Sequence, residues 1–497
     1  MFRVFLLSAI TLLSFPALSQ RLITPLEYSG FTSLTTHKEM MNFLSYISTL
    51  KGVNISKNII AVSPGGRDIP VLEFSLGEFG KDPDKLKVLL FAQQHGSEHS
   101  GKEAALLLIG ELANGALNDA LQVLDVAVIP MMNPDGNEVD RRRNGNNADL
   151  NRDHLILEQP ENIGLQKYFY KYLFDVSMDV HEYYPYSEDW IALGFRKNSD
   201  VTVGCLTNIN TPQKFRDYAN EEYLPFVKDY LNLFKFSFAE YTPAGIPESE
   251  YMRYSTFDIN DGRQGFGSLA TFSFIQEGKN GEDSADNIER RAYSQMVGMI
   301  ACLQFSAKNH EEIKELVKSE RIKLAEGEPE FVSVQMEHTS DGSTLELPVI
   351  SLKTDRDSVV SVKNFRPVVS SLFNVRKPFG YLIPVENKDL VEWTKKHHLE
   401  TSVYEPNAKD IIESYFITGI DSIDFEGDPV INPSCKVELV KPTELKGNYL
   451  FVPTKQLAGN IIVQALEPKS MIGLATYKKY ENLVTAGTMF PILRLVE

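Results

Sequence analysis

Residues 95–99 of the chain, HGSEH, contain three side chains that can ligate a metal ion: His95, Glu98 and His99. Imidazole and carboxylate groups of this kind commonly hold zinc in proteins. Two different zinc motifs share these letters. In the first, H-x-x-E-H lies within one helix, the two histidines bind the metal and the glutamate is a base. In the second, His95 and Glu98 are both ligands, and a third ligand comes from elsewhere in the chain.

The surrounding sequence argues against the first motif. The apolar run KLKVLLFAQQ (85–94) predicts a strand that leads directly into His95, and Gly96 follows at once. Helix-forming residues come next, with Ser100 as the expected N-cap and Glu103 as the second half of a capping box. The HGSEH segment is therefore expected on a strand-to-helix turn, outside the carboxyl end of a strand, where α/β sheets place their ligand sites.

Polar residues near three later predicted strands can complete such a site. The segment NPDGNEVDRRRNGNNADLNRDH (133–154) follows the strand VAVIP, SMDVHEYYP (177–185) carries His181, and FSFIQEGKNG (272–281) carries Glu277. A lone H-x-x-E is weak evidence. Five elements in the order H-x-x-E, N-P-D-G, R-x8-N-R, D-x-H and a late strand-end Glu form a specific pattern. Over about residues 30–310 the chain resembles the zinc carboxypeptidases of the carboxypeptidase A and carboxypeptidase D/E kind.

This resemblance implies a metal site and a general base. His95, Glu98 and His181 would bind one zinc ion per chain, which is a ligand set found in catalytic zinc sites. Zinc would lower the pKa of its bound water to about 7. Glu277 would take a proton from that water as general base and then deliver the proton to the leaving amine.

The resemblance also implies how the substrate is held. Arg142 would polarise the scissile carbonyl and stabilise the oxyanion. A shift of one position in the alignment would give this role to its neighbour Arg141 or Arg143 instead. Asn151 and Arg152 would bind the free α-carboxylate of a peptide substrate. Asp149 would accept a hydrogen bond from His95 and orient its imidazole.

The match to the family is looser between residues 248 and 278. Family members commonly have a mobile tyrosine some twenty residues before the catalytic glutamate, which closes over the substrate. Tyr251 and Tyr254 are the candidates in this chain, and neither has the usual spacing. Arg263 could contact a further anionic group or could be an ordinary loop arginine. The preferred C-terminal residue of the substrate is therefore left open.

The elements that must position these residues alternate between strands and helices. Over residues 20–327 this alternation predicts an α/β domain, with a mixed, largely parallel sheet and helices on both faces. Beyond about residue 327, one predicted helix, ENKDLVEWTKKHHLE, interrupts short strand-like runs: FVSVQME, TLELPVISLK, DSVVSVKNF, YLFVPT and NIIVQAL. A smaller, mainly β domain is therefore predicted at 328–497. His397 and His398, in the predicted helix, are interpreted as surface residues.

Charge and the first residues restrict partners and location. The net charge of −17, from 50 basic and 67 acidic residues, argues against a nucleic-acid partner. Residues 1–19 have the arrangement of a secretory signal peptide: one arginine, an apolar run, and Ala17-Leu18-Ser19 before an expected cut after Ser19. The apolar run is shorter than the ~20 residues that span a bilayer, and no later segment is long and apolar enough. The mature protein is expected to be secreted or periplasmic, without a membrane span.

Cysteine chemistry contributes little to these expectations. Cys205, Cys302 and Cys435 allow at most one internal disulfide, and no C-x-x-C pair is present. Cysteine-based metal or redox chemistry is therefore not expected.

The sequence favours an exported zinc metallocarboxypeptidase that hydrolyses the C-terminal peptide bond of peptides. A zinc amidase or deacylase acting on cell-wall peptides or N-acyl amino acids is the first alternative. Asn151 and Arg152 would suit any substrate with a carboxylate next to the cleaved bond. A non-catalytic binding module is the second alternative. It is less favoured because the three zinc ligands and Glu277 are all present.

Overall fold

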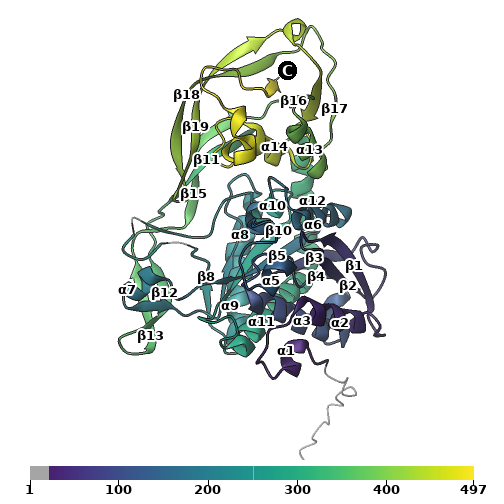
Figure 1. Ribbon diagram of the computed structural model, residues 1–497, viewed down its shortest axis with the longest axis vertical. Coiled ribbons are helices and arrows are strands. Elements are labelled where there is room, and N and C mark those ends of the chain that lie inside the picture. The colour runs from purple at the N-terminus through teal and green to yellow at the C-terminus, as the bar shows by residue number, and fades with distance from the viewer. Residues whose placement is uncertain (1–21, 244, 250, 497) are drawn as a thin grey trace, which may run out of the picture.

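The computed structural model describes residues 22–243, 245–249 and 251–496. The predicted signal peptide, residues 1–19, lies outside this part of the chain. In the described part, no helix combines the length and the apolar character that crossing a bilayer requires. An α/β part contains the earlier residues, and a β-rich part built from the later residues lies above it in Figure 1.

An eight-stranded sheet forms the centre of the α/β part. Its strands lie in the order β1 (Asn54–Val62), β2 (Asp68–Ser75), β4 (Leu124–Ile129), β3 (Leu86–Ala92), β5 (Val176–Tyr183), β10 (Phe272–Lys279), β7 (Val201–Gly204) and β8 (Phe238–Glu240). The central strands β4, β3, β5 and β10 are parallel, as are β7 and β8. The pairs β1–β2, β2–β4 and β10–β7 are antiparallel. The predicted mixed, largely parallel sheet is therefore confirmed.

Helices cover both faces of this sheet because the central strands are apolar on both sides. Alternating side chains of β3 enter different clusters: Val88 and Leu90 on one face, Leu89 and Phe91 on the other. The first face packs against helices α2 (His37–Ile47), α3 (His99–Ala113), α9 (Leu224–Leu233) and α11 (Ile288–Lys308). The second face packs against α6 (Pro160–Tyr172) and α10 (Gly262–Gly267). The shorter helices of this part are α1 (Pro25–Tyr28), α4 (Asn118–Leu121), α5 (Pro134–Glu138), α7 (Glu188–Ala192) and α8 (Gln213–Tyr218).

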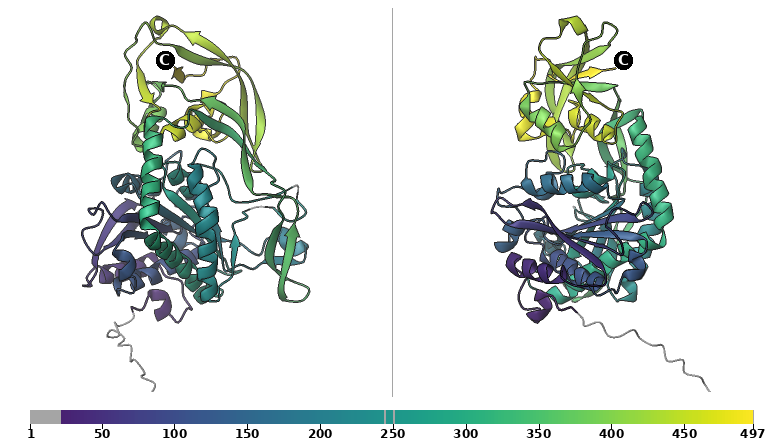
Figure 2. Two further views of the ribbon diagram at one scale, coloured as in Figure 1. Left: turned by 180° about the vertical axis from the view of Figure 1, so that it is seen from behind. Right: turned by 90° about the vertical axis from the view of Figure 1, so that its right-hand side faces the viewer.

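The later residues add to the core on that second face. Trp393 and Ile462 belong to the same buried cluster as Leu89 and Phe91. The indole Nε1 of Trp393 donates a hydrogen bond to the carbonyl of Leu155 at 2.8 Å. Helix α12 (His310–Glu326) leads from the α/β part up to the β-rich part, as Figure 2 shows. The boundary predicted near residue 327 remains a prediction, and the two parts share one core.

The β-rich part contains one six-stranded sheet and several smaller ones. The larger sheet has the order β17 (Ser402–Val403), β20 (Tyr449–Pro453), β16 (Gly380–Pro384), β21 (Leu493–Leu495), β18 (Ile412–Phe425) and β19 (Asp428–Val440). Strands β11 (Phe331–Thr339) and β15 (Val368–Arg376) form a pair. The hairpin β12 (Leu345–Ser351) and β13 (Arg356–Val362) extends beside the α/β part, where β12 pairs with β6 (Phe195–Lys197) (Figure 1). The short β14 (Phe365–Arg366) pairs with β9 (Met252–Arg253).

Two expectations for the later residues are wrong. The run NIIVQAL, predicted as a strand, lies in helix α14 (Gly459–Leu466), in which every residue is buried. A short run that is buried on all sides has no periodicity that separates a helix from a strand. The predicted helix is observed as the shorter α13 (Lys388–Lys396); His397 directly follows it and is buried rather than at the surface. Its Nε2 donates to the Leu155 carbonyl at 2.6 Å, while His398 is exposed.

The three cysteines are all free thiols. Cys205 and Cys302 are buried, and burial raises the pKa of each thiol to about 12. Both thiols are therefore protonated at neutral pH. A protonated, buried thiol is a poor nucleophile and a poor metal ligand, so cysteine chemistry is not a function of these two residues.

Candidate active site

A turn after strand β3 presents the first two candidate ligands. β3 ends at Ala92 and helix α3 begins at His99, so His95 and Glu98 lie on the connection between them. The one-helix version of H-x-x-E-H needs both histidines on the same helical face. This version is excluded because His95 precedes the helix.

The expected cap of α3 is not the one that forms. Glu98 is the N-cap residue, and no side chain caps the helix. Ser100 instead donates its hydroxyl to Glu182 at 2.5 Å. Glu103 accepts hydrogen bonds from the backbone nitrogen and hydroxyl of Thr35. The predicted capping box is wrong, because both of its side chains bond to residues distant in the sequence.

The N-P-D-G motif holds this turn against the segment that carries Arg142. A Cβ atom on Gly96 would lie 2.2 Å from the backbone of Gly136, so the two chains approach as closely as glycine permits. The Asn133 side chain donates to the carbonyls of both Gln94 and Arg142, each at 3.1 Å. The motif therefore fixes the H-x-x-E turn relative to Arg142, in addition to forming a turn itself.

The side chains of His95, Glu98 and His181 converge on one point. One potential ligand atom from each lies within 4.8 Å of the other two, and all three residues are buried. The Nδ1 atoms of His95 and His181 lie 2.8 and 2.9 Å from the two carboxylate oxygens of Glu98. Burial favours a protonated Glu98, but the adjacent imidazoles hold the pKa of its carboxyl well below the usual range. Two imidazole nitrogens and an ionised carboxylate are donors that suit zinc.

The other nitrogen of each imidazole is fixed by a carboxylate. His95 Nε2 donates to Asp149 at 3.0 Å, and His181 Nε2 lies 2.8 Å from an oxygen of Asp179. Such contacts orient a histidine ligand and select the tautomer whose free nitrogen faces the metal. The Asp149 contact matches the role expected from the sequence. Asp179 has the same function on β5, where it lies two residues before His181 and thus on the same face of the strand.

Arg142 lies at the edge of this group. Its Nε and Nη2 bond to the same oxygen of Asp149 at 3.0 and 2.9 Å. Its Nη1 lies 3.1 Å from His95 Nδ1 and 3.6 Å from Glu98. Half of the side chain, 49%, is exposed, so the guanidinium is held by Asp149 and still faces solvent. Arg143, by contrast, donates to the carbonyl of Asn147 and is exposed.

Asn151 and Arg152 have different environments. The Asn151 side chain is buried: its oxygen accepts from Gly262 N at 2.9 Å, and its nitrogen lies 3.3 Å from His181 Nε2. The Arg152 side chain is 49% exposed, and its Nε lies 3.8 Å from Asp258. Burial opposes the charge of Arg152, but Asp258 and other nearby carboxylates raise the pKa of its guanidinium. Arg152 is thus the solvent-accessible, positively charged residue of the pair, whereas Asn151 is buried next to His181.

Glu277 lies directly beside the third candidate ligand. Strand β10 pairs with β5 in parallel, and Glu277 is opposite His181. Glu277 is buried, with an exposed fraction of only 6%. Burial and the charge of Glu98 raise the pKa of Glu277 to about 7, against the opposing effect of the two histidines. A carboxyl group with such a pKa can both accept and release a proton near neutral pH.

Tyr241 is a site residue that the sequence did not reveal. It follows edge strand β8, and its side chain interacts with the Glu277 carboxyl and lowers the pKa of that group. Tyr241 lies 36 residues before Glu277. The family pattern predicts a tyrosine only some twenty residues before the base. The parallel register of β7 and β8 brings Tyr241 to the site, and no local motif marks it.

The two tyrosines considered from the sequence lie in other environments. Tyr254 is buried, and its hydroxyl accepts a hydrogen bond from the backbone nitrogen of Cys205 at 2.9 Å. Tyr251 is partly exposed, with the guanidinium of Arg366 4.1 Å from its ring centre. Arg263 is also buried, in contact with Asp261 at 2.8 Å, so it is a structural arginine of its loop.

His99 faces away from the candidate metal site. Its Nε2 lies 2.9 Å from a carboxylate oxygen of Asp140. Burial and the nearby charge of Lys102 lower the pKa of His99 to about 4. His99 is therefore a neutral, buried residue that supports the start of α3.

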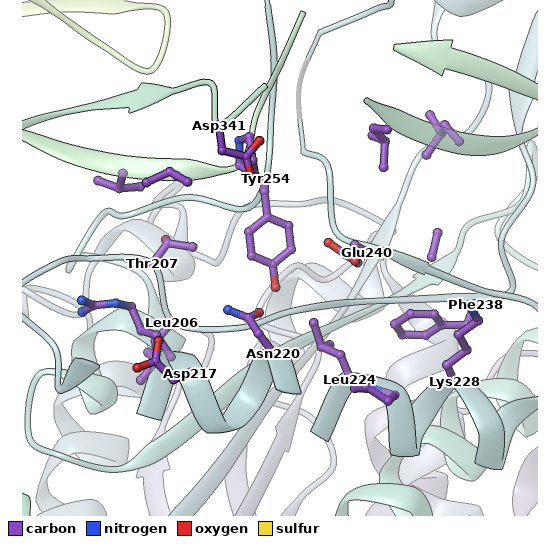
Figure 3. A pocket seen from close by; sticks show the side chains of 18 of the residues that line it. Leu206, Thr207, Asp217, Asn220, Leu224, Lys228, Phe238, Glu240, Tyr254 and Asp341 are labelled. Carbon is purple, nitrogen blue, oxygen red and sulfur yellow. The ribbon is translucent and has the colours of Figure 1, made fainter. Parts of the chain in front are cut away.

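A cavity with a volume of about 880 Å³ lies elsewhere. It is bordered by edge strand β8, by α8 and α9, and by residues 341–348 of the β-rich part. Figure 3 shows Tyr254 extending across it from the side of Asp341 toward Asn220. Among the described lining residues, none is a candidate metal ligand or Glu277. This cavity is a feature separate from the metal site.

The chain has detectable similarity to known proteins. The model of the family described as zinc carboxypeptidase matches residues 40–183. Carboxypeptidase 2 of Trichophyton rubrum is 23% identical over 454 residues, which is 87% of this chain and 81% of that protein. Carboxypeptidase E of Caenorhabditis elegans is 31% identical over 131 residues, 22% of this chain and 28% of that protein. A crystal structure of a metallo-carboxypeptidase from Burkholderia cenocepacia aligns with a TM-score of 0.44 and 19% identity, covering 56% of this chain and 71% of that chain.

An α/β sheet with a His-Glu-His group at the ends of its strands, beside a buried glutamate, is an arrangement that suits a metallohydrolase. Residues 40–183 match the zinc carboxypeptidase family model, in agreement with the resemblance that the sequence motifs showed. It is a hydrolase of the metallocarboxypeptidase class. The matched residues include the three candidate ligands, and Glu277 lies beyond them.

Proposed function

We propose that this protein is an exported zinc metallocarboxypeptidase that removes the C-terminal residue of peptides with a free α-carboxylate. The observation that carries the proposal is the convergence of His95, Glu98 and His181 beside Glu277. These residues come from three segments of the chain, and the parallel strands bring them to one edge of the sheet. Replacing a buried ionic group by well-packed apolar residues is often neutral or stabilising, so stability alone does not explain this group.

His95, Glu98 and His181 would hold one zinc ion. The donor set fits this metal, because each histidine has one nitrogen directed at the group and the other fixed by a carboxylate. Bound zinc would polarise the scissile carbonyl and lower the pKa of water to about 7. The chain's own residues supply the remaining functions.

Glu277 would act as general base and then as general acid. It is the carboxylate next to the ligands that makes no ion pair among the described residues. It would accept a proton from the attacking water and deliver it to the amine that leaves. The Tyr241 side chain, which interacts with this carboxyl, would help to hold it in position.

Arg142 and Arg152 would bind the two oxygen-bearing groups of the substrate. Arg142 is fixed by Asp149 and faces the metal ligands, so it is placed to stabilise the oxyanion. Arg152, on the neighbouring segment, has a guanidinium that is equally exposed, and it would bind the α-carboxylate. Asn151 would contribute to the same carboxylate site, beside His181.

Export is proposed from the sequence alone. Residues 1–19 have the features of a secretory signal, with cleavage expected after Ser19. The mature chain would then begin at Gln20 and act outside the cytoplasm.

Trimming of only free C-termini is the expected result that tests this function. The purified chain is incubated with a peptide pool in which half of the peptides have free C-termini and half are amidated. Mass spectrometry follows the products with and without a chelator. We expect chelator-sensitive loss of single residues from the free-acid peptides, because only these offer a carboxylate to Arg152.

Other products would redirect the proposal. Equal trimming of amidated peptides would contradict the carboxylate-binding role of Arg152. Stable peptides together with one bound zinc per chain would favour an amidase or deacylase of cell-wall peptides or N-acyl amino acids. Stable peptides together with no metal bound to the chain would favour a binding module and would refute an enzymatic function.

Arg142→Gln is expected to lower kcat by about 10²–10³-fold, the usual cost of removing one oxyanion donor. Arg143→Gln is the matched control, because Arg143 bonds only to the Asn147 carbonyl among its described contacts and should leave kcat unchanged. Steady-state kinetics on a free-acid peptide compare the two variants. A larger loss for Arg143→Gln would show that the register of this arginine triplet is misassigned.

A further inference from the structure

The long β18–β19 ribbon of the β-rich part ends in a tight turn with an unusual residue. Phe425 and Asp428 form the last pair of the ribbon, so Glu426 and Gly427 are the two turn residues. Their φ angles are 55° and 105°. Turns of this kind favour asparagine, aspartate or glycine at both positions. A glutamate in the left-handed region costs conformational energy, and such residues concentrate where the structure uses them.

The carboxylate of Glu426 is buried in contacts with a loop of the α/β part. It accepts a hydrogen bond from Phe257 N at 3.2 Å and lies 3.2 Å from Nη1 of Arg253. His338 of β11 adds a third contact at 3.1 Å. The side chain is only 9% exposed. The ribbon tip is therefore anchored on residues 253–257 by a charged group that three partners hold.

This loop continues into the residues that hold the proposed carboxylate-binding segment. Asp258 is the ion-pair partner of Arg152, at 3.8 Å. The Asn260 side chain donates to the backbone carbonyl of Arg152. Gly262 N donates to the side-chain oxygen of Asn151 at 2.9 Å. Both residues expected to bind the substrate carboxylate are thus positioned by residues 258–262.

A second residue of the β-rich part reaches the same loop. The hydroxyl of Tyr477 accepts a hydrogen bond from the Asn260 side chain at 2.8 Å. The oxygen of that Asn260 amide accepts from Leu155 N at 2.6 Å. Asn260 is completely buried, so its amide has to find its partners within the protein. Tyr477 supplies one of them.

We propose that Glu426 and Tyr477 are positioning residues for substrate recognition: through the loop 253–262 they set the place of Arg152 and Asn151. The β-rich part is then a component of the carboxylate-binding site. The inference rests on the proposed function, and it assigns a role to a region that no motif explained. The metal ligands and Glu277 lie on β3–α3, β5 and β10, outside this loop.

The location of the contacts predicts a specific kinetic effect. A carboxylate that does not react is bound equally in the ground state and in the transition state. Loss of such uniform binding raises KM and leaves kcat unchanged. A general loss of structure would instead lower kcat or the amount of bound zinc.

The test uses Glu426→Gln and Tyr477→Phe in the full chain. Glu426→Gln keeps the shape of the side chain and removes its charge next to Arg253. Tyr477→Phe removes only the hydroxyl that Asn260 contacts. We expect KM for a free-acid peptide to rise at least fivefold in each variant, with kcat within twofold of the parent chain.

Matched controls come from the same region. Glu413→Gln changes an ion-paired glutamate at the other end of β18, next to Arg494. Tyr404→Phe removes a hydroxyl that bonds to Asp410. Neither residue has a described contact with the loop 253–262, so both variants should keep the KM of the parent chain. Bound zinc and Tm are measured for all four variants.

Three outcomes would overturn the inference. An unchanged KM in both test variants would show that the loop holds its place without them. A lower kcat, less zinc or an equal rise of KM in the controls would show a general structural role. A parent chain that trims no free-acid peptide would refute the proposed function itself, and the inference with it.

Discussion

Glu277→Gln is expected to lower kcat by about 10²–10⁴-fold, the usual contribution of general acid–base catalysis. Glutamine has the size of glutamate but can neither accept nor deliver the proton. The change should leave zinc in place, because Glu277 is on β10 while the ligands lie on β5 and on the turn after β3. Steady-state kinetics on a free-acid peptide measure the loss, and metal analysis of the same sample measures the zinc.

Glu240→Gln is the control for this change. Glu240 lies on the edge strand β8 and lines the separate cavity rather than the metal site (Figure 3). We expect it to keep the kcat of the parent chain. If Glu277→Gln with full zinc retains more than a tenth of the parent kcat, another residue must move the proton, and Tyr241 would be the first to examine.

His181→Asn should abolish both zinc binding and activity, whereas His99→Asn should keep both. His181 is one of three residues whose ligand atoms converge, and a catalytic site of two ligands would hold zinc weakly. His99 is the second histidine of the rejected one-helix motif, and it bonds to Asp140 instead. The pair of variants therefore separates the two interpretations of H-x-x-E-H.

The decisive measurement is zinc content after dialysis against a weak chelator, with Tm recorded for both variants. Loss of the His99 contact to Asp140 is expected to lower stability only modestly, since Asp140 is half exposed. Loss of zinc from His99→Asn, with retention in His181→Asn, would reverse the ligand assignment.

Much of the candidate site could be predicted because its residues lie at the ends of strands. Parallel strands place their carboxyl ends at one edge of a sheet, so His95, His181 and Glu277 were expected to meet there. Each also stands in a short motif whose spacing is visible in the sequence. The strands themselves are continuous apolar runs, since both faces of the sheet are covered.

The features that the sequence did not predict depend on contacts between distant segments. Tyr241 reaches Glu277 through the pairing of edge strands, and no local spacing marks it. Asn260 and Glu426 are ordinary polar residues in the sequence, and their importance comes from partners in other regions. Helix α14 was mistaken for a strand because burial on all sides removes the helical pattern. Local sequence cannot carry any of this information.

The shared core has a consequence for how the protein assembles as it is made. The buried cluster that contains Leu89 and Phe91 of β3 also contains Trp393, Ile462 and Ile492, which are synthesised hundreds of residues later. Until those residues emerge, this cluster is incomplete. Many domains fold one after another during synthesis. Here the shared cluster is complete only once residues as late as Ile492 have been synthesised.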